Sequence, residues 1–578
     1  MENKKWRLAE VVPEEQKKAF PEMSPIFLQL LWQRGLKTRA EIETFLNPDW
    51  SRDAHEPFLF NQMAEAVERT FLALEVGEVI TIHGDYDADG VCGTAVVYST
   101  LRDICRQLNF DVTKLTTYIP HREREGYGLF VATAEHLHEH DKTDLLITAD
   151  CGISNAEAIA RGLELGFDTI ICDHHAVPEN LPEAIILHPQ VVGENYPYKT
   201  LCGAGVAFKF ASALLVEARQ RGANFPEGYE KWLLDLVAIA TVTDVMPLLG
   251  ENRVLENYGL LVLKKTRRLG LQKLLVTAGV SADKVDTWNI GFQIGPRLNA
   301  AGRMDHADPA FRLLISEDEQ EAEILAGQLH TANTLRQKKS EEIFQAALEQ
   351  IGEPGSRKIL TAIGEWPAGL VGLAAGKIAE KFSRPVIIVA RDSEKFTGSG
   401  RSIPAFDIMK SLNAAAPFLD RFGGHPQACG FSVTSEEKIK AALAAMTAVA
   451  EAELIAEDLV AEFFIEAEVS LSKINWELET AISQLAPFGE GNRQPIFATR
   501  GLQLVSFETM GLEGKHLRMT VRDPAEGIIK KMVAFGWGKI VSELQIGGLI
   551  DVAYTIGINE WNGNRELQLR VEDLRLIS

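Results

Sequence analysis

Short runs of aliphatic and β-branched residues recur along the first two thirds of the chain, and polar residues follow each run. The runs occupy residues 79–82, 145–148, 169–172 and 385–389. Continuously apolar runs of this length are typical of strands that are buried on both faces, and helical patterns separate them. The pattern predicts an α/β fold in which helices cover both faces of a parallel sheet.

The longest helical pattern covers residues 317–351. This segment contains no proline and a single glycine, and its apolar residues recur mostly at every third or fourth position. At 1.5 Å per residue, the predicted helix would be about 50 Å long. We expect it to bridge two domains, and a helix packed inside one domain is the alternative.

The chain changes character after residue 459, where strand-like runs dominate. Runs at residues 517–521, 528–535, 549–556 and 567–571 alternate with Gly and Asn turns, which favours a small barrel. Residues 357–454 form a second α/β segment. The expected organisation is an N-terminal region, a catalytic domain, a linker helix, a second α/β domain and a barrel, at residues 1–75, 76–316, 317–352, 353–458 and 459–578.

Length and composition are those of a soluble protein with several domains. The 578 residues exceed the usual domain size of roughly 100 to 200 residues. Charged residues interrupt the N-terminal segment, and no run approaches the roughly 20 apolar residues of a membrane span, so we expect a cytoplasmic protein. Six cysteines without a CxxC pair favour buried thiols over disulfides or thiolate zinc. The net charge of −22 excludes a wholly basic surface, although a local groove can still be positive.

The segment HGDYDADG, residues 83–90, carries the first candidate chemistry. Imidazole and carboxylate groups stand at every second position after an apolar run, and an extended backbone would point them in one direction. Such groups repel each other unless a cation lies between them, which favours metal binding. The alternative is a polar turn in which an Asp caps a helix and Gly90 closes the bend.

Three later positions offer similar ligands. Asp150 follows the run at 145–148, the triplet Asp173-His174-His175 follows the run at 169–172, and Asp244 ends an apolar helical stretch. Ligands bind at the carboxyl ends of parallel strands, so these residues can converge. Each residue alone is more often a cap or a satisfied polar group. Together they favour a site of carboxylates and imidazoles without thiolates, which suits Mn²⁺ or Mg²⁺.

These segments, HGDYDADG, TADCG (148–152), the DHH triplet and VTDV (242–245), resemble the signature motifs of the DHH phosphoesterases. The resemblance implies phosphodiester hydrolysis with two divalent cations, which lower the pKa of a water and stabilise the leaving oxygen. It also implies that His175 faces the substrate phosphate and that Asp85 and Asp173 are alternative or outer ligands. The implied ligands are His83, Asp87 and Asp150 for one ion, and Asp89, Asp150, His174 and Asp244 for the other.

Two glycine-rich segments, GSGRS (398–402) and GGHPQACG (423–430), resemble loops of the DHH-associated domain, DHHA1. Glycines let a backbone approach a phosphate, and side chains such as Ser399, Arg401 and His425 can contact its oxygens. The segment GPRLNAAGRM (295–304) adds Arg297, Asn299 and Arg303 as phosphate donors. The alternative for these arginines is pairing with local carboxylates such as Asp305 and Asp308.

The order of domains, with APFGEGN (486–492) opening the barrel, resembles the single-stranded-DNA-specific 5′ to 3′ exonucleases of the DHH family over nearly the whole chain. The resemblance implies roles in DNA recombination and repair, with single-stranded DNA, a single-strand-binding protein and a helicase as partners. The barrel resembles an OB fold, in which basic and aromatic side chains follow a strand. The candidates there are Lys515, Arg518, Lys530, Lys531, Trp537 and Trp561, although aromatic residues at strand spacing are more often core.

Two other functions are compatible with parts of this pattern. A nanoRNase or cyclic-dinucleotide phosphodiesterase shares the DHH and associated domains, but such proteins are typically shorter and lack the terminal barrel. An inactive scaffold that binds single strands is the second alternative. The intact set of expected ligands counts against a scaffold.

Overall fold

The structure is a computed structural model that describes residues 4–392, 395–561 and 563–577. Two compact units divide the chain. One contains Ala54–Met246 and Val254–Val460, and the other combines the chain up to Asp53, the segment Pro247–Arg253 and the chain from Ala461 onward. No helix among the described residues is both long enough and apolar enough to cross a membrane.

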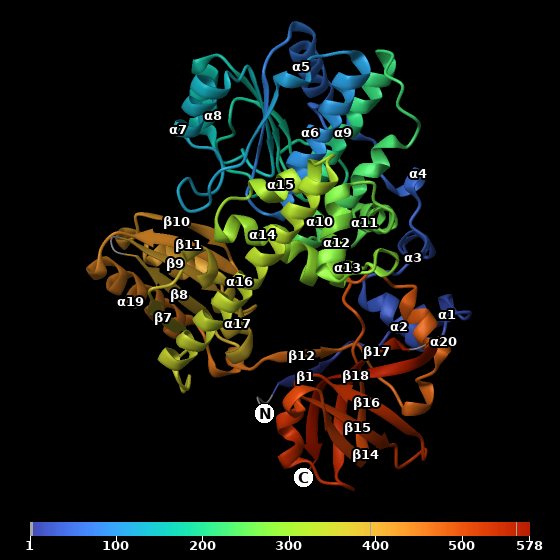
Figure 1. The fold of residues 1–578 in the computed structure, drawn as a ribbon. Helices are drawn as coiled ribbons and strands as arrows, with labels where there is room; N and C mark the ends of the chain where they lie inside the picture. The colour runs from blue at the N-terminus through green and yellow to red at the C-terminus, as the bar shows by residue number, and fades with distance from the viewer. Residues whose placement is uncertain (1–3, 393–394, 562, 578) are drawn as a thin grey trace. The chain divides into compact units, whose positions relative to one another are not determined.

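A five-stranded, fully parallel sheet forms the first part of the larger unit, as the first three apolar runs predict. The fourth run, at residues 385–389, lies instead in the second, mostly antiparallel sheet. The strands of the parallel sheet lie in the order β3-β2-β4-β5-β6. Helices cover both faces: α5, α6 and α9 lie on one side, and α7 and α8 on the other (Figure 1). The strands are β2 (Ile80–Gly84), β3 (Leu115–Tyr118), β4 (Leu145–Ala149), β5 (Asp168–Cys172) and β6 (Ile185–Leu187). The helices are α5 (Met63–Val76), α6 (Ala88–Leu108), α7 (Val131–His136), α8 (Ala156–Leu165) and α9 (Gly203–Gln220).

A group of helices follows this sheet in the chain and packs against its helical layer. The helix α10 is apolar on all sides and packs against both α6 and α9, so its last residues lie close to the strand ends. A short π-helix leads without a break into α14. The bounds are α10 (Leu234–Thr243), α12 (Leu269–Ala278), α13 (Thr287–Asn289), the π-helix η6 (Ile290–Ile294), α14 (Gly295–Met304) and α15 (Asp308–Ile315).

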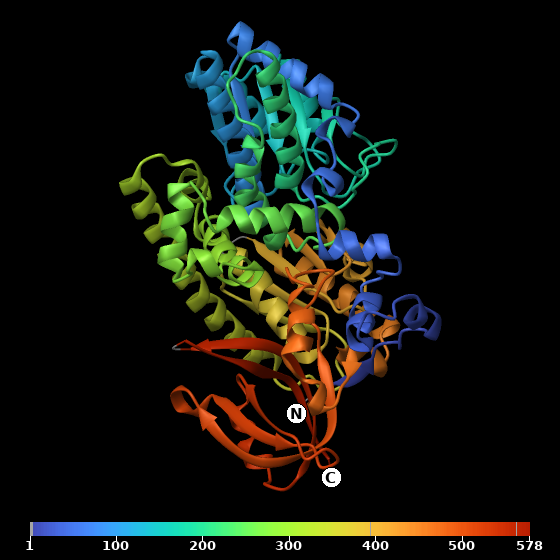
Figure 2. The ribbon, with the colours of Figure 1, turned by 90° about the vertical axis from the view of Figure 1, so that its right-hand side faces the viewer.

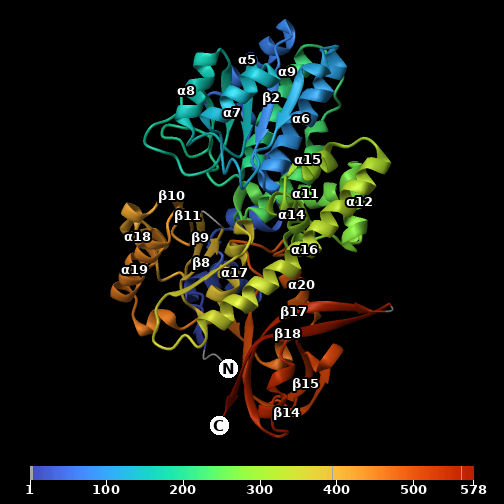
Figure 3. The same ribbon diagram turned by 60° about the vertical axis from the view of Figure 1, so that its left-hand side comes forward.

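The predicted long helix is confirmed as α16 (Glu319–Ile351), a single helix of 33 residues. Asp318 caps its first turn by accepting a hydrogen bond from the Glu321 backbone nitrogen. The helix packs against α12, α14 and α15, and its final turns enter the core of the second sheet. The helix therefore bridges the two sheets of the larger unit, next to α17 (Ala368–Phe382) (Figure 3).

The second sheet has the order β10-β11-β9-β8-β7, and only β7 and β8 are parallel. The expected glycine loops are wrong, because the first glycine-rich segment lies almost entirely in β9 and the second spans the ends of β10 and β11 with a short turn between them. Their glycines leave room for side chains that cross the sheet: a Cβ at Gly398 would lie 2.1 Å from the Phe431 ring, and one at Gly400 would lie 2.6 Å from the Cys429 sulfur. The elements are β7 (Leu360–Gly364), β8 (Val386–Arg391), β9 (Phe396–Arg401), β10 (Arg421–His425), β11 (Ala428–Val433), α18 (Ile408–Ala414) and α19 (Glu436–Glu453).

The smaller unit is a closed barrel, because β14 pairs with both β15 and β17 and so completes a ring of five strands (Figure 2, orange to red). The four predicted runs are confirmed as β15 to β18. The N-terminal helices pack on the barrel core, and β1 (Lys5–Leu8) pairs with β12 (Glu462–Ile465). The other elements are α2 (Pro25–Gln33), α3 (Arg39–Leu46), α20 (Trp476–Ser483), β13 (Ala467–Glu468), β14 (Phe497–Met510), β15 (His516–Arg522), β16 (Ile529–Ala534), β17 (Leu549–Trp561) and β18 (Asn564–Ile577).

Candidate metal centre

The carboxyl ends of β2, β4 and β5 bring the predicted ligands together. The register pairs His83 with Thr148 and Ala149 with Cys172, so Asp150 and Asp173 follow at the same edge of the sheet. Asp150 has a left-handed backbone with φ of 64°, a conformation that Asp tolerates better than most residues. A Cβ at Gly203 would lie 2.5 Å from the Asp150 side chain, so glycine is needed there to admit the carboxylate.

The segment after His83 does not stay extended, and the expectation of alternating ligands along a strand is wrong. The strand β2 ends at Gly84, and α6 begins at Ala88. Asp87 caps α6 and accepts hydrogen bonds from the backbone nitrogens of Asp89 and Gly90. A Cβ at Gly90 would lie 2.6 Å from the Asp85 nitrogen, so glycine permits this tight bend. The helix turn, rather than strand alternation, directs these carboxylates to one place.

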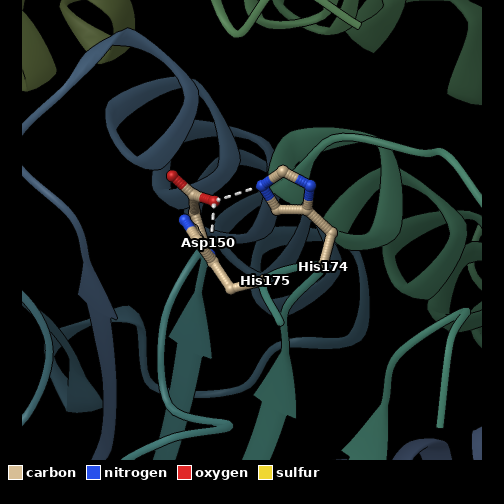
Figure 4. A group of neighbouring side chains, drawn as sticks. All are labelled: Asp150, His174 and His175. Atoms are coloured by element: carbon tan, nitrogen blue, oxygen red, sulfur yellow. Dashed lines mark ion pairs between the residues drawn. The ribbon is translucent and has the colours of Figure 1, made fainter. Parts of the chain in front are cut away.

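His174 lies at the centre of the cluster. Its Nε2 atom is 3.2 Å from Asp150 Oδ1, 3.4 Å from Asp244 Oδ2 and 3.8 Å from Asp89 Oδ2. Figure 4 shows the His174 ring directed at the Asp150 carboxylate. Asp244 arrives from the last turn of α10, as the apolar helical stretch predicts. Residues from four separate segments of the chain therefore meet within one small volume.

The donor set fits divalent cations. Three groups of ligand atoms lie within 4.8 Å of one another: Asp150 with His174 and His175, Asp89 with His174 and Asp244, and Asp85 with Asp87 and Asp150. Five buried ligand atoms of the predicted site residues have no hydrogen-bond partner among the described residues. They are His83 Nε2, Asp85 Oδ1, Asp150 Oδ1, His174 Nε2 and Asp244 Oδ2. Buried polar atoms are nearly always paired, so this concentration of unpaired donors to a metal supports a cation site.

The second and third groups resemble the two expected ligand sets, with one difference. The set of Asp89, His174 and Asp244 is present, and Asp150 lies beside it. In the other set, Asp85 occupies the position within reach of Asp87 and Asp150, and His83 belongs to none of the groups. The His83 ring lies against Tyr118 at 5.5 Å between centroids, with its Nε2 buried and unpaired. Asp85 is thus a stronger candidate ligand than the motif pattern indicates.

Electrostatics also favour a bound cation. Burial raises the pKa of Asp150 well above its usual range, and the charges of Asp89, Asp87 and Asp85 raise it further. Burial and Asp89 raise the pKa of Asp244 to about 8. Burial lowers the pKa of His174 to about 3, so its imidazole is neutral and has a lone pair for a metal. Carboxylates that resist ionisation together become stable anions once a cation neutralises them.

His175 differs from its neighbour because Asp173 holds it. The His175 Nδ1 atom lies 2.8 Å from Asp173 Oδ1 and 2.9 Å from the Tyr127 hydroxyl. Burial by itself would lower the pKa of His175, but the hydrogen bond to Asp173 and the negative charges of Asp173, Asp244 and Asp89 together outweigh burial, and the pKa rises to about 9. Asp173 also accepts hydrogen bonds from the backbone nitrogens of Ile153 and His174. Asp173 therefore positions a protonated imidazole and is not placed as a ligand.

A cluster of arginines lies beside the carboxylates. Burial lowers the pKa of Arg303 to about 10, and the charges of Arg122, Arg336 and Arg401 lower it further. Arg401 donates hydrogen bonds to Ser399 Oγ and to the Gly400 carbonyl, and Arg303 donates to the Gly369 carbonyl. None of the four guanidinium groups pairs with a carboxylate within the described part of the chain. Unpaired cations that repel one another are typical of an anion site.

Comparisons with known proteins agree with this geometry. Sequence profiles match at residues 79–241 for the DHH family N-terminal domain, at 356–452 for the DHHA1 domain and at 465–573 for the RecJ OB domain. The single-stranded-DNA-specific exonuclease RecJ of Bacillus subtilis (strain 168) is 35% identical over 556 residues, which cover 95% of this chain and 68% of that protein. The chain belongs to the RecJ family. RecJ of Escherichia coli (strain K12) is 30% identical over 574 residues, covering 96% of both proteins.

Solved RecJ structures have the same fold. The crystal structure of RecJ from Thermus thermophilus in complex with Mn²⁺ has a TM-score of 0.82 at 29% identity, and the match covers 99% of this chain and 79% of that chain. A second crystal structure of that RecJ contains Mg²⁺ and has a TM-score of 0.77 at 27% identity, with coverage of 99% and 78%. These are the two ions that the donor set in this RecJ-family chain suits.

The structure brings some predicted phosphate donors to the arginine cluster and engages the others in contacts within the protein. Arg303, Ser399 and Arg401 meet in the arginine cluster, and the charge of His425 lowers the pKa of His174, which places that side chain nearby. Arg297 instead contacts the Gln293 carbonyl and His330, and the Asn299 amide oxygen accepts a hydrogen bond from the Ala88 nitrogen. No described ion pair joins Arg297 or Arg303 to Asp305 or Asp308, so that alternative is wrong.

Sequence reasoning missed several residues that the fold brings to the site. The backbone nitrogens of Gly203 and Ala204, at the start of α9, donate hydrogen bonds of 2.7 Å to the predicted ligand Asp89. Tyr127 contacts His175, and Arg122 lies over the Tyr86 ring at 4.7 Å. Arg122, Arg124 and Tyr127 form a basic and aromatic segment in the sequence, which is a visible signal. Arg336 had no such signal, because one Arg in a long helix is ordinary.

The barrel candidates divide between surface and core. Lys515, Arg518 and Lys531 are exposed, although Arg518 pairs with Glu508 at 3.1 Å. Lys530 donates to the Ile474 carbonyl, and Trp537 packs against the barrel core, as aromatic residues at strand spacing usually do. The side chain of Trp561 lies outside the described residues.

Proposed function

We propose that this chain is a metal-dependent exonuclease that degrades single-stranded DNA from the 5′ end by phosphodiester hydrolysis, in DNA recombination and repair. The observation that supports this proposal best is that a site for cations and a site for anions lie side by side. A carboxylate and imidazole cluster that fits cations lies beside four arginines, none of which forms an ion pair with a carboxylate among the described residues. Cations bound by the carboxylates and imidazoles would promote cleavage of a phosphodiester, and the neighbouring arginines would bind a second phosphate.

The side chains have separate tasks in this proposal. Two divalent cations bound by Asp85, Asp87, Asp89, Asp150, His174 and Asp244, with His83 as a further ligand, would supply an activated water and stabilise the leaving oxygen. Arg303, Arg401 and Ser399 bind the terminal 5′ phosphate. His175, kept protonated by Asp173, donates a hydrogen bond to an oxygen of the phosphate that is cut. Water adds to phosphorus, the bond to the 3′ oxygen breaks, and the terminal nucleotide leaves with its 5′ phosphate.

The arginine cluster supports the 5′ polarity. A terminal phosphate carries more negative charge than an internal phosphodiester, so desolvated and unpaired guanidinium groups favour it. The RecJ OB match at residues 465–573 favours long single strands over the dinucleotides of shorter DHH proteins. We also propose the cytoplasm as the compartment, and a single-strand-binding protein and a helicase as partners, on family likeness alone.

The direct test follows a single-stranded oligonucleotide that is labelled at either end and digested with Mn²⁺. We expect nucleotides to leave from the 5′ end first and duplex to resist digestion. Asp244→Asn should abolish digestion, and the matched control Asp168→Asn, at the opposite end of β5, should not. Release from the 3′ end first, or equal digestion of duplex, would refute the proposal. Faster hydrolysis of dinucleotides than of long strands would favour a nanoRNase instead.

A further inference from the structure

Two aromatic side chains on a single turn of helix stand out from the rest of the surface. Trp288 and Phe292 are the two most exposed aromatic side chains among the described residues, at 54% and 67%. Their rings are stacked on each other, with centroids 5.4 Å apart and planes inclined by 28°. Single exposed apolar residues are common on proteins, whereas an exposed stacked pair is typical of a binding surface.

The backbone holds this pair rigidly. Asp286 and Asn289 form a reciprocal cap at the start of α13, with hydrogen bonds of 2.9 and 3.0 Å. Ile290 and Ile294 of η6 are fully buried on the opposite side. This turn is a π-helix, a form that is rare and is frequently found at functional sites. The rings are therefore presented to solvent by an ordered support.

The support is continuous with the candidate metal centre. Gly295 lets α14 approach the last turn of α10, because a Cβ there would lie 2.2 Å from Thr243. Gly291 of η6 faces Val242 of the same turn. Asp244 follows directly. At the other end, α13, η6 and α14 follow one another without a break as one helical rod, and α14 contains Arg303. The rod thus joins the exposed rings to the arginine cluster, and it packs beside α10, which ends at the candidate ligand Asp244.

We propose that Trp288 and Phe292 form a platform on which bases of the bound single strand stack, and that this platform contributes to the preference for single strands. The inference rests on the proposed function. Flat rings that already stack leave an outer face on which another flat ring can continue the stack. Bases in a duplex are covered by their neighbours, whereas bases of a single strand are free to occupy this face.

The helical rod sets the distance between the platform and the arginine cluster. Phe292 and Arg303 are separated by 11 residues, which corresponds to about 16 Å along a helix. At the rise of about 3.4 Å per nucleotide in one strand of a duplex, about five nucleotides span this distance. The platform therefore acts on oligonucleotides and not on dinucleotides. Stacking involves no phosphate, so its contribution is independent of salt.

The test measures binding of a 5′-phosphorylated 12-nucleotide strand to the full chain in EDTA, by fluorescence anisotropy. Each strand carries one abasic site, which is moved from the second to the eighth nucleotide. We expect one or two of these positions to weaken binding to the unmodified protein by about tenfold. The double variant Trp288→Ala/Phe292→Ala should bind the intact strand about tenfold more weakly, and abasic sites should then have no further effect at those positions.

Matched variants separate stacking from general apolar contact. Trp288→Phe should retain binding, because it keeps a flat ring, whereas Trp288→Leu should lose it. Phe58→Ala removes another exposed aromatic side chain of the same unit and should leave binding unchanged. Thermal melting of each variant checks that it is folded. The salt dependence of binding should be the same for the unmodified protein and the double variant.

Two results overturn the platform. One is that no abasic position weakens binding to the unmodified protein. The other is that the double variant loses affinity equally for intact and abasic strands, which indicates that another protein surface covers the rings. Failure of the proposed function is distinct, because the unmodified protein would then fail to digest single strands in Mn²⁺. If it digests them and the abasic series is flat, the platform alone is wrong.

Discussion

Asp150→Asn should be more stable than the unmodified protein when metal is absent and less stable than the unmodified protein when metal is bound. Asparagine has the same shape, and it tolerates the left-handed backbone of this position better than other uncharged residues. The substitution therefore removes one charge and leaves the geometry unchanged. It tests whether the carboxylates around Asp150 are held together by cations.

The magnitude follows from the spacing of the cluster. Charged ligand atoms that lie within 4.8 Å of one another repel each other by about 3 kcal/mol or more at an effective dielectric constant of about 20. The metal-free protein relieves most of this repulsion by protonation, since the pKa of Asp150 is raised well above its usual range. We expect metal-free Asp150→Asn to be more stable than the unmodified protein by on the order of 1 kcal/mol, with a melting temperature about 2 °C higher.

Excess Mn²⁺ should have the opposite effect. An ion present at about 100 times its dissociation constant adds about 2.7 kcal/mol to the stability of the folded state. The unmodified protein gains this stabilisation, and Asp150→Asn loses most of it because the shared ligand is weakened. Loss of about 4 kcal/mol of transition-state stabilisation corresponds to roughly 10³-fold slower hydrolysis.

The assay is thermal melting in EDTA and in excess Mn²⁺, together with digestion of a labelled single strand. Asp168→Asn, which removes an exposed carboxylate at the amino end of β5, should show the same Mn²⁺ shift as the unmodified protein. An equal Mn²⁺ shift for Asp150→Asn would show that the ions do not depend on this residue. A large loss of stability in EDTA would show that the carboxylate has a structural role instead.

Three further predictions concern separate residues. Arg401→Met should weaken binding of a 5′-phosphorylated strand and reduce the slope of log affinity against log salt concentration by about 1. Binding of a strand that ends in a 5′ hydroxyl should not change. Equal loss of affinity for both strands would argue against a terminal-phosphate site. Val245→Asn should raise the free energy of unfolding, measured with denaturant, by about 1 kcal/mol. The reason is that the exposed Val245 has a left-handed φ of 57°, which β-branched residues adopt only with strain. An unchanged free energy of unfolding would mean that neighbouring residues relieve this strain. Glu256, on α11 (Gly250–Leu263), is fully buried, and its carboxylate oxygens accept no hydrogen bond among the described residues. Burial raises the pKa of Glu256 well above 4.5. The contribution of Glu256 to the free energy of unfolding is therefore fully present below pH 4.5 and declines as the pH rises toward the pKa of the folded state. Denaturant unfolding should therefore show Glu256→Gln becoming more stable relative to the unmodified protein as pH rises above about 5, by up to about 1.4 kcal/mol per pH unit, and a constant difference would contradict the buried carboxyl.

The sequence motifs predicted where the candidate metal centre lies, but they predicted the arrangement of its carboxylates less well. The ends of β4 and β5 are where the apolar runs end, because a strand that is buried on both faces must be apolar and the polar residues after it must reach solvent or a ligand. The alternation in HGDYDADG was misleading. A helix start and a strand end both place carboxylates at short intervals, and only the bend at Gly90 decides which carboxylates meet. This bend brings Asp85 within reach of Asp87 and Asp150.

Contacts between distant segments were beyond the reach of local patterns. Arg122, Arg303, Arg336 and Arg401 come from a loop, two helices and a strand, and no spacing in the sequence relates them. The glycines of β9 resembled a loop because glycine weakens strand propensity, yet they are placed where the Phe431 ring and the Cys429 sulfur of β11 pack against them.

The sequence by itself determined the fold class, the long helix, the barrel and the candidate ligands at the strand ends, because each depends on periodicity or on residues next to one another in the chain. The tertiary structure alone decided which carboxylates lie together, that Asp173 holds His175, and that four unpaired arginines gather beside them. These properties depend on burial and on distances between side chains of separate elements. Both arise only when the sheet, α10 and α14 pack together.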